Sequence, residues 1–432
     1  MSILAKFTEW LGHKLDLVIL APHPMAVGNC AEQIYFGLLK ARREHKKLLL
    51  LFQFPLPGPL SIRLANRVLF TLESEYRYSS DRSLPYLAGS GLLTVYGLLC
   101  RLIKRPMRVL GFPLSDIDTY PMLGHTTLWQ PQESMPEFSW DVVRSYAWPE
   151  QLREPMPVAL PAACQAEIAR ERARLGLPED AWFACLHVRE SGFHGDKISE
   201  RNATIANYGL AIKEITDRGG WVIRMGDNSM TPMPKMERVI DYPFTSSKSA
   251  LMDIYLIAAC RVYIGMSSGI FDVARLLQRP IILTNMSSWL YPYPQAPGDL
   301  GVFKHVFSKS RNRFLSVKEW MNAGWEGVSF IEAMQGDYVL HENTPEELRA
   351  VVAEFFQRNG EGKATPLQQA LIDLRLEKGT EYLNMTVVKD DEFSDFHQRY
   401  RLASRLDSAV GLISEAYLAQ NWEHDALNTV RQ

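Results

Sequence analysis

Short apolar runs alternate with amphipathic segments through the middle of the chain. The runs WFACLHV, WVIRM, RVYI and PIIL are continuous rather than alternating, which is typical of strands buried on both faces. The segments between them carry apolar residues at helical spacing. The pattern predicts strands at 182–188, 221–225, 239–241, 261–264 and 280–283, and helices at 163–175, 202–218, 249–259 and 269–277. Such alternation predicts a parallel sheet covered by helices on both faces.

The same alternation occurs once near the N-terminus. LDLVIL at 15–20 and KLLLLF at 47–52 predict buried strands, and residues 30–44 between them predict a helix. This part of the chain therefore predicts one βαβ unit. The Pro-rich stretch 54–59 and the Trp- and Pro-rich region 106–161 predict loops and a linker.

The C-terminal part carries a clear helix start. Thr344, Pro345 and Glu347 occupy the cap, first-turn and capping-box positions of a helix, and the last forty or so residues predict one or two amphipathic helices. A chain of 432 residues is too long for one ordinary core. We therefore expect an α/β protein with two Rossmann-like domains, 1–165 and 166–390, and a C-terminal helical segment, 391–432.

The composition of the chain excludes several classes of protein. The net charge is −2, from 47 basic and 49 acidic residues, so no global field attracts nucleic acid, and no nucleic-acid partner is expected. The five cysteines are scattered, without a CxxC pair or zinc-ligand spacing, and predict reduced core thiols. Neither a signal peptide nor an apolar run of about 18 residues stands out. These features predict a cytoplasmic protein.

Polar and basic residues follow three of the predicted strands. Ligands of parallel sheets bind where the carboxyl ends of the strands meet, and a small-residue turn before a helix presents backbone N–H groups to an anion. Arginine side chains from neighbouring strands could contact the same anion with charge-assisted hydrogen bonds. The candidates are His187 and Arg189 after the first strand, Arg224, Gly226 and Asp227 after the second, and Ser267, Ser268 and Gly269 after the fourth. Together they predict a phosphate site.

Each of these pieces also has a purely structural interpretation. An arginine after a strand is often a salt-bridge residue, and Ser-Ser-Gly before a helix is most often an N-cap. Gly226-Asp227-Asn228 is typical of a turn, because Asp and Asn bond to their own backbone. The functional hypothesis rests on three strand ends of one sheet carrying phosphate-compatible groups together.

Two stretches resemble known glycosyltransferases. Residues 249–285, SALMDIYLIAACRVYIGMSSGIFDVARLLQRPIILTN, resemble the nucleotide-sugar-binding segment of heptosyltransferase-like GT-B enzymes. HVRESGFHGD, which begins at His187, resembles the HxR segment of fucosyltransferase-like GT-B enzymes. The whole array over about 182–285 looks like a group of bacterial GT-B glycosyltransferases. One departure is Ser267, where the heptosyltransferase turn usually has an acidic residue, so the sugar cannot be carried over.

The resemblance implies a fold, a reaction and residue roles. It implies two GT-B-like domains with a cleft between them, which transfer a sugar from a nucleotide-sugar to a glycan, lipid-linked or protein acceptor. No DxD-type pair follows a strand, so neither metal nor cofactor is expected. The alternatives are a non-catalytic nucleotide-sugar-binding or scaffold protein, or a pyruvyl- or phosphate-transferring enzyme of surface polysaccharide synthesis. By resemblance Arg189, Arg224, Ser267, Ser268 and Gly269 contact the donor phosphates, Asp227 contacts the ribose or base, and His187 and Gly226 complete the donor site.

The catalytic base is predicted in the loop and helix after the first strand. GT-B enzymes place acceptor-side groups there, and heptosyltransferase-like proteins often have Gly-Asp where this chain has Gly28-Asn29. His23 is one candidate, because two flanking prolines restrict its backbone and an imidazole titrates near neutrality. Glu32, one helical turn beyond Gly28, is the other. His23 could equally cap a carbonyl group.

Residues 91–110 combine an apolar stretch with Arg101, Lys104, Arg105 and Arg108. One interpretation is a core helix with a solvated basic end. The other is a peripheral contact with an anionic membrane, which would bring the protein to a lipid-linked acceptor.

Overall fold

The computed structural model describes residues 10, 12–22, 24, 26–54, 56, 64–78, 83–111, 156–190, 200–289, 293–323, 336–387 and 410–430. These residues form two compact units. The first consists of the described residues up to Cys164 together with Arg275–Gln278, and the second of Gln165–Ala274 and the described residues of Arg279–Gln432.

The first unit contains the predicted βαβ unit. Strand β1 (Leu17–Leu20) pairs in parallel with β2 (Lys47–Leu50), and helix α2 (Val27–Arg43) connects them. Both strands are buried because nearly every residue is apolar. The unit also contains a 3₁₀ turn, η2 (Arg67–Phe70), and the long helix α3 (Leu84–Val109). The described residues of this unit show two parallel strands, so a full Rossmann-like domain here stays a prediction.

The second unit is built on a seven-stranded sheet in which all neighbouring strands are parallel. The order is β12-β8-β7-β6-β3-β4-β5. The predicted strands are confirmed as β3 (Phe183–His187), β4 (Trp221–Arg224), β5 (Val239–Asp241), β6 (Val262–Gly265) and β7 (Ile281–Met286). The chain runs outward from β3 through β4 to β5, returns to the other side of β3, and continues outward from β6 to β8 (Leu300–Phe303). This is the strand order of a doubly wound Rossmann-like sheet.

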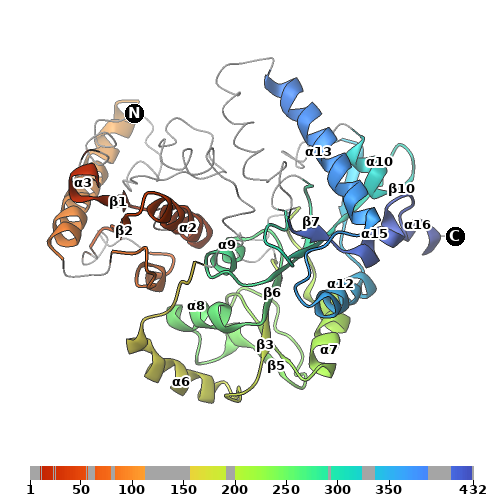
Figure 1. Ribbon diagram of the computed structural model, residues 1–432, viewed down its shortest axis with the longest axis horizontal. Helices are drawn as coiled ribbons and strands as arrows, with labels where there is room; N and C mark the ends of the chain where they lie inside the picture. The colour runs from red at the N-terminus through yellow and green to blue at the C-terminus, as the bar shows by residue number, and fades with distance from the viewer. Residues whose placement is uncertain are drawn as a thin grey trace. The chain divides into compact units, whose positions relative to one another are not determined.

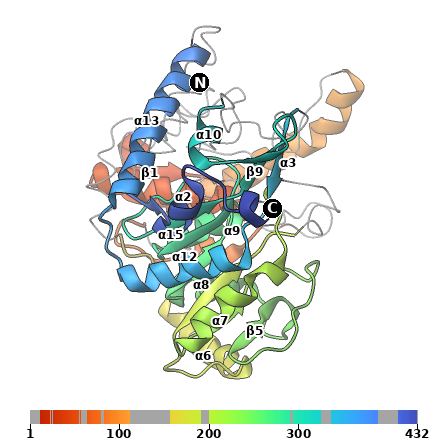
Figure 2. The same ribbon diagram turned by 90° about the vertical axis from the view of Figure 1, so that its right-hand side faces the viewer.

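Helices cover both faces of this sheet (Figure 1). Helices α6 (Gln165–Arg174), α8 (Ala250–Ala259) and α9 (Gly269–Leu276) lie on one side. Helices α7 (Gly209–Asp217), α12 (Pro345–Arg358) and α15 (Glu415–Asn421) lie on the other, which faces the viewer in Figure 2. Helix α12 begins with the predicted capping box between Thr344 and Glu347. The helix expected at 202–218 starts as a 3₁₀ turn, η6 (Ile205–Tyr208), before α7.

Several elements were not predicted. The sheet continues through β8 to β12 (Leu412–Ile413), a two-residue edge strand within the segment expected to be helical. A small antiparallel sheet consists of β10 (Arg313–Leu315), β9 (His305–Ser308) and β11 (Tyr338–His341). The remaining helices are α10 (Val317–Met321), α13 (Pro366–Val387) and α16 (Leu427–Val430).

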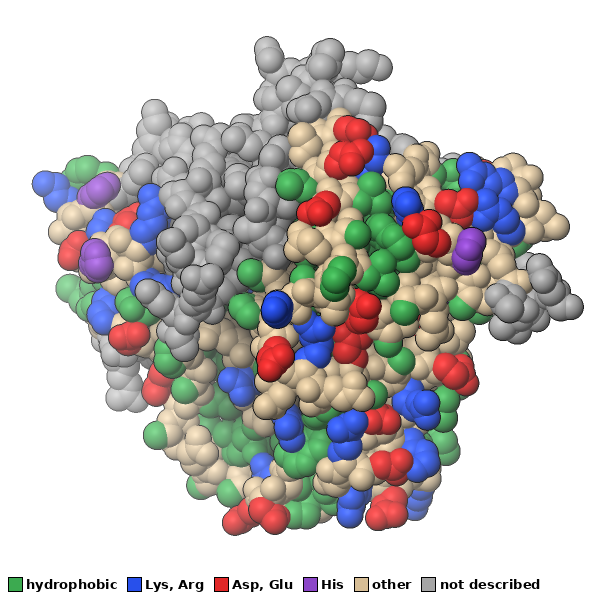
Figure 3. Space-filling view, turned by 45° about the vertical axis from the view of Figure 1, so that its right-hand side comes forward, with side chains coloured by type: hydrophobic (Ala, Val, Ile, Leu, Met, Phe, Trp, Pro, Cys, Tyr) green, Lys and Arg blue, Asp and Glu red, His purple; other side chains and the backbone are tan. Residues whose placement is uncertain are grey.

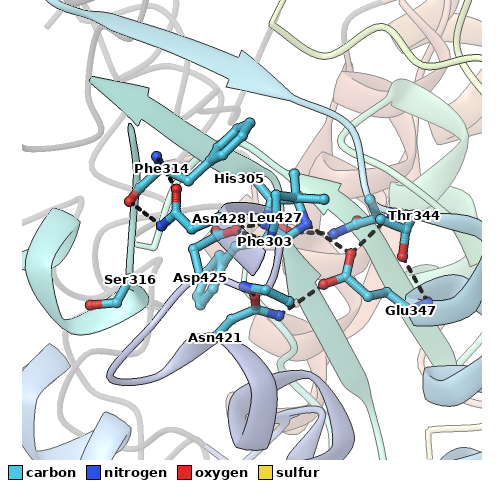
Figure 4. Close-up of polar contacts among 12 residues, drawn as sticks. Phe303, His305, Phe314, Ser316, Thr344, Glu347, Asn421, Asp425, Leu427 and Asn428 are labelled. Atoms are coloured by element: carbon cyan, nitrogen blue, oxygen red, sulfur yellow. Dashed lines mark hydrogen bonds and ion pairs between the residues drawn. The ribbon is translucent and has the colours of Figure 1, made fainter. Parts of the chain in front are cut away.

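A buried ionic network attaches the last described segment to the second unit (Figure 4). The Nδ1 atom of His305 lies 2.7 Å from Asp425 Oδ2, and its Nε2 atom lies 2.8 Å from Glu347 Oε2. Asn421 donates a hydrogen bond to the other oxygen of Glu347. All four side chains are buried. Burial lowers the pKa of His305, but the hydrogen bonds with Asp425 and Glu347 outweigh it and raise the pKa to about 9.

The surface charge is mixed. On the face drawn in Figure 3, basic and acidic side chains are interspersed over the second unit, in keeping with the near-zero net charge. Among the described residues, one helix, α3, is long and apolar enough to cross a membrane by length and composition alone. The expectation concerned an unbroken apolar run, and Ser90, Thr94 and Arg101 interrupt the apolar residues of α3.

Candidate functional site

The sheet of the second unit has a switch point between β3 and β6. The two strands are neighbours, with His187 opposite Gly265 at their carboxyl ends, and the chain leaves them in opposite directions. In doubly wound sheets the connections then diverge and leave a crevice outside the strand ends, where ligands bind. The residues after β3 and β6 are the ones predicted from the sequence.

His187 and Ser268 meet at this point. Their side chains are hydrogen-bonded, with 3.2 Å between the Nδ1 atom and the Oγ atom, and the donor depends on the tautomer of the ring. Burial and the positive charges of Arg189, Arg224 and Lys248 lower the pKa of His187 to about 4. Burial is the first cause of this shift, and the nearby positive charge of Arg189 would favour an anion at this point.

Arg189 lies two residues beyond β3 and is partly buried. Its backbone N–H donates to the Met266 sulfur and its carbonyl accepts from Ala203, which fixes the main chain against β6 and the segment after residue 200. Among the described residues no acceptor lies within hydrogen-bonding distance of its guanidinium group. Burial and the neighbouring Arg201 lower its pKa. The guanidinium therefore has charge and donors to offer an anion.

The structure gives Arg224 a different place from the predicted one. Its side chain is 0% exposed and forms ion pairs with Glu190 at 3.3 Å and Asp241 at 3.0 Å. It also donates to the carbonyl of Thr231. Glu190 in turn accepts the Thr231 N–H. The Arg224 guanidinium is buried, and two carboxylates already balance its charge, so the predicted direct contact with a donor phosphate does not fit this arrangement. Its bonds instead hold the loop after β4.

Gly226 and Asp227 form the turn that the residue types favour. Gly226 has a φ of +144°, and a Cβ atom there would overlap the Met230 side chain, so only glycine fits. The Asp227 carboxylate accepts the backbone N–H of Ser229 at 2.8 Å, as in an Asx turn. Asp227 lies close enough to His187 to act on its pKa in the direction opposite to the cations.

Ser267 and Gly269 stand at the start of α9. Ser267 is partly buried and Gly269 is exposed, and the carbonyl of Ser268 accepts the N–H of Phe271 to close the first turn. The N-terminal amide groups of a helix attract an anion. Asp272 also lies in this turn, so a favourable charge for an incoming phosphate depends on Arg189.

A hydrogen-bond network that was not predicted connects the strand ends. The hydroxyl of Tyr208 lies 2.7 Å from that of Thr284, which donates to the carbonyl of Gly265. Asn285 donates to the same tyrosine oxygen. Thr284 and Asn285 directly follow the predicted strand 280–283, so the rule used for the other strand ends would have found them. Tyr208 carries no such signal, because it lies in a 3₁₀ turn.

A buried lysine also lies close to this edge of the sheet. Lys304, between β8 and β9, donates to the carbonyl of Asn202 at 2.6 Å. Burial lowers its pKa, while the carboxylates of Glu342 and Glu200 act in the opposite direction. The residue was missed because β8 was not predicted. Its bond holds the segment that follows Arg189.

Of the two predicted catalytic bases, the structure describes Glu32. It lies on α2, is 1% exposed, and forms an ion pair with Arg275 at 3.0 Å, inside the first unit. A buried carboxylate held by an arginine has a structural role there. His23 lies outside the described residues.

Among the described residues, no group of three or more His, Cys, Asp and Glu side chains is arranged to hold a metal ion. The described cysteines are unpaired thiols, and burial raises the pKa of Cys30 far above its usual range.

Comparison with known proteins gives a weak likeness to a solved structure. No protein-family model and no curated protein sequence matches this chain. The solved structure of a glycosyl transferase family 9 protein from Veillonella parvula DSM 2008 is similar over 62% of this chain and 79% of that one, with 10% identity and a TM-score of 0.34. A likeness of this size assigns neither a family nor an activity.

Proposed function

We propose that this protein is a nucleotide-sugar-dependent glycosyltransferase whose donor diphosphate binds at the switch point of the second unit. The observation that carries the proposal is the hydrogen bond between His187 and Ser268 at the N-terminus of α9, with the positive charge of Arg189 close enough to lower the pKa of His187. No described residue forms a hydrogen bond with the Arg189 guanidinium. A Rossmann-like sheet with a positive, partly buried site at this position suits the phosphates of a nucleotide.

The residues have separate roles in this proposal. Arg189 and the amide groups at Ser268 and Gly269 stabilise the charge that develops on the departing diphosphate as its bond to the sugar C1 breaks. The acceptor oxygen forms the new bond to C1, and a base removes its proton. Asp227, Gly226 and Ser267 are further donor-site residues in this proposal, and Arg224 acts indirectly through its ion pair with Glu190. No metal is required, since arginine and helix amides supply the positive charge.

His23 is the remaining sequence candidate for the base. The acceptor is a glycan, a lipid-linked sugar or a protein. Glu32 is removed from the base assignment by its burial and its pairing with Arg275.

The test is a thermal-shift panel of UDP-, GDP-, CMP-, ADP- and dTDP-sugars. A ligand at 100 times its Kd stabilises the folded state by about 2.7 kcal/mol. One class of nucleotide-sugar should raise the melting temperature of the unmodified protein and leave that of the Arg189→Gln variant unchanged. If no nucleotide-sugar or nucleoside diphosphate raises it, the donor site proposed here does not exist.

A second candidate, a nucleotide-sugar-binding protein without catalysis, is favoured by the structural engagement of Glu32. Slow release of the nucleoside diphosphate from a bound nucleotide-sugar separates the two, because a binding protein leaves its ligand intact.

A further inference from the structure

We infer that the outer face of α3 binds the surface of an anionic membrane. The inference is independent of the donor site, because α3 belongs to the first unit and shares no residue with the switch point.

The inner face of α3 is fixed to the first unit. Tyr86, Ser90, Leu93, Thr94 and Gly97 are buried and recur three or four residues apart, so they share one side of the helix. The Thr94 hydroxyl accepts the backbone N–H of Phe54 at 2.8 Å.

Close packing and a side-chain hydrogen bond hold the same face. A Cβ atom at Gly89 would overlap Leu51, and one at Gly97 would overlap Gln53. Arg101 donates to the Gln53 side chain at 2.9 Å. The helix is therefore held at close range to the segment after β2.

The opposite face of α3 is apolar and exposed, where a helix on a soluble domain normally carries polar residues. Leu92, Val95, Leu99 and Leu102 recur on this side and are 68%, 57%, 54% and 60% exposed. Leu84, Leu87, Tyr96, Ile103, Val109 and Leu110 are also exposed. Ten of the fifteen large exposed apolar residues of the described chain thus lie within 27 positions, a concentration typical of an interaction surface.

The charge of α3 favours an anionic binding partner. Residues 84–111 contain Arg101, Lys104, Arg105 and Arg108 but no Asp or Glu. A second copy of the helix would add further positive charges to the interface, whereas anionic headgroups carry the opposite charge and are attracted to basic segments. Long basic side chains can also reach headgroups while their stems lie along apolar surface. Apolar area next to a cationic cluster is the combination that binds anionic lipid.

The helix lies on the membrane rather than across it. A spanning helix would have to separate from Leu51, Gln53 and Phe54. It would lose the hydrogen bonds between Phe54 and Thr94 and between Arg101 and Gln53, and unpaired polar groups are costly in lipid. A helix that keeps its inner contacts can bury its outer face in the interfacial region, about 5–10 Å deep.

Co-sedimentation with vesicles tests the inference. The unmodified protein should bind vesicles of phosphatidylcholine and phosphatidylglycerol, bind phosphatidylcholine alone much less, and be released by salt. The triple variant Leu92→Gln, Leu99→Gln, Leu102→Gln should bind the mixed vesicles about tenfold more weakly or worse. The pair Lys104→Gln, Arg108→Gln should lose about fivefold for each charge removed.

A matched control is the triple variant Met236→Gln, Phe244→Gln, Leu376→Gln, which removes three exposed apolar side chains of the second unit and should bind as the unmodified protein does. Circular dichroism and thermal melting verify that each variant is folded. Equal binding by the α3 and control variants would overturn the inference. So would binding to phosphatidylcholine alone as strongly as to the mixture, or a lipid-free dimer that the α3 variant abolishes. None of these outcomes bears on nucleotide-sugar binding.

Discussion

The Nδ1 atom of His187 lies 3.2 Å from the Oγ atom of Ser268, although the residues are 81 positions apart. The pair joins the carboxyl end of β3 to the start of α9, at the point where the proposed diphosphate binds. Because it responds to nearby charge, His187 can report on whether an anion enters the site.

Ligand binding should be coupled to proton uptake at His187. Its pKa is about 4 in the free protein, lowered by burial and by Arg189 and Arg224, and a bound diphosphate would raise it. At a pH between the pKa of His187 in the free protein and its higher pKa in the complex, binding is accompanied by protonation of His187. Calorimetry of nucleoside diphosphate binding at mildly acidic pH, in buffers of different ionisation enthalpy, measures this uptake. It should disappear in His187→Gln, and uptake that persists in this variant would assign it to another group.

Replacement of Arg189 by Gln should weaken nucleoside diphosphate binding by about 1.5–3 kcal/mol, the range for hydrogen bonds to charged groups. The folded state should be unaffected, because no described residue bonds to the guanidinium. Arg174→Gln is the matched control, since that arginine is also partly exposed but pairs with Glu171 on α6. Isothermal calorimetry gives both affinities. Equal affinity in the two variants would remove Arg189 from the site.

Arg224→Ala should act mainly on stability. The side chain is fully buried between Glu190 and Asp241, and its removal leaves two carboxylates without their counter-charge, which costs about 3–5 kcal/mol. Urea unfolding should show this loss. Any loss of nucleotide affinity should then follow from disorder of the loop after β4. A variant as stable as the unmodified protein but deficient in binding would restore the predicted phosphate contact.

The difference between Arg189 and Arg224 shows where the sequence stops being informative. Both arginines accompany the end of a strand, so the rule about carboxyl ends selects both. What distinguishes the two arginines is the strand order. Strand β4 lies between β3 and β5, so Arg224 has Glu190 on one side and Asp241 on the other. Neighbours of this kind are set by three-dimensional pairing that a single sequence does not reveal.

The strands of the Rossmann-like sheet were predictable because continuous apolar runs mark strands buried on both faces. Strand β5 was predicted with its observed bounds. Strand β12 was not, since two residues at a sheet edge leave no periodic pattern. The apolar residues of the outer face of α3 are visible in the sequence, but a core helix and an interfacial helix have similar compositions. Only the exposure of these side chains in the structure distinguishes the two kinds of helix.

Glu32→Gln should destabilise the first unit without removing catalysis. Glu32 is buried and paired with Arg275, so its neutralisation leaves a buried guanidinium without a counter-charge, at a cost of about 3–5 kcal/mol. Loss of a general base would instead lower kcat by roughly 10²–10⁴. We expect kcat per folded molecule to change by less than about tenfold, and His23→Ala to show the larger loss. The opposite ranking would return Glu32 to the base assignment.

Stability should decrease as the pH rises through the titration of His305. Its pKa in the folded state is about 9, above the ordinary value of 6.5, because Asp425 and Glu347 stabilise the charged ring despite its burial. The folded state therefore binds more protons than the unfolded state between these values. The contribution is fully present below about pH 6.5 and is lost as the pH approaches and passes 9. Urea unfolding across this range should show the loss in the unmodified protein and in the control His424→Gln, whose exposed histidine lies on the same segment. In His305→Gln the slope should vanish while stability is lower throughout, because Asp425 and Glu347 remain buried without their cation. A slope that survives this substitution would place the titration elsewhere.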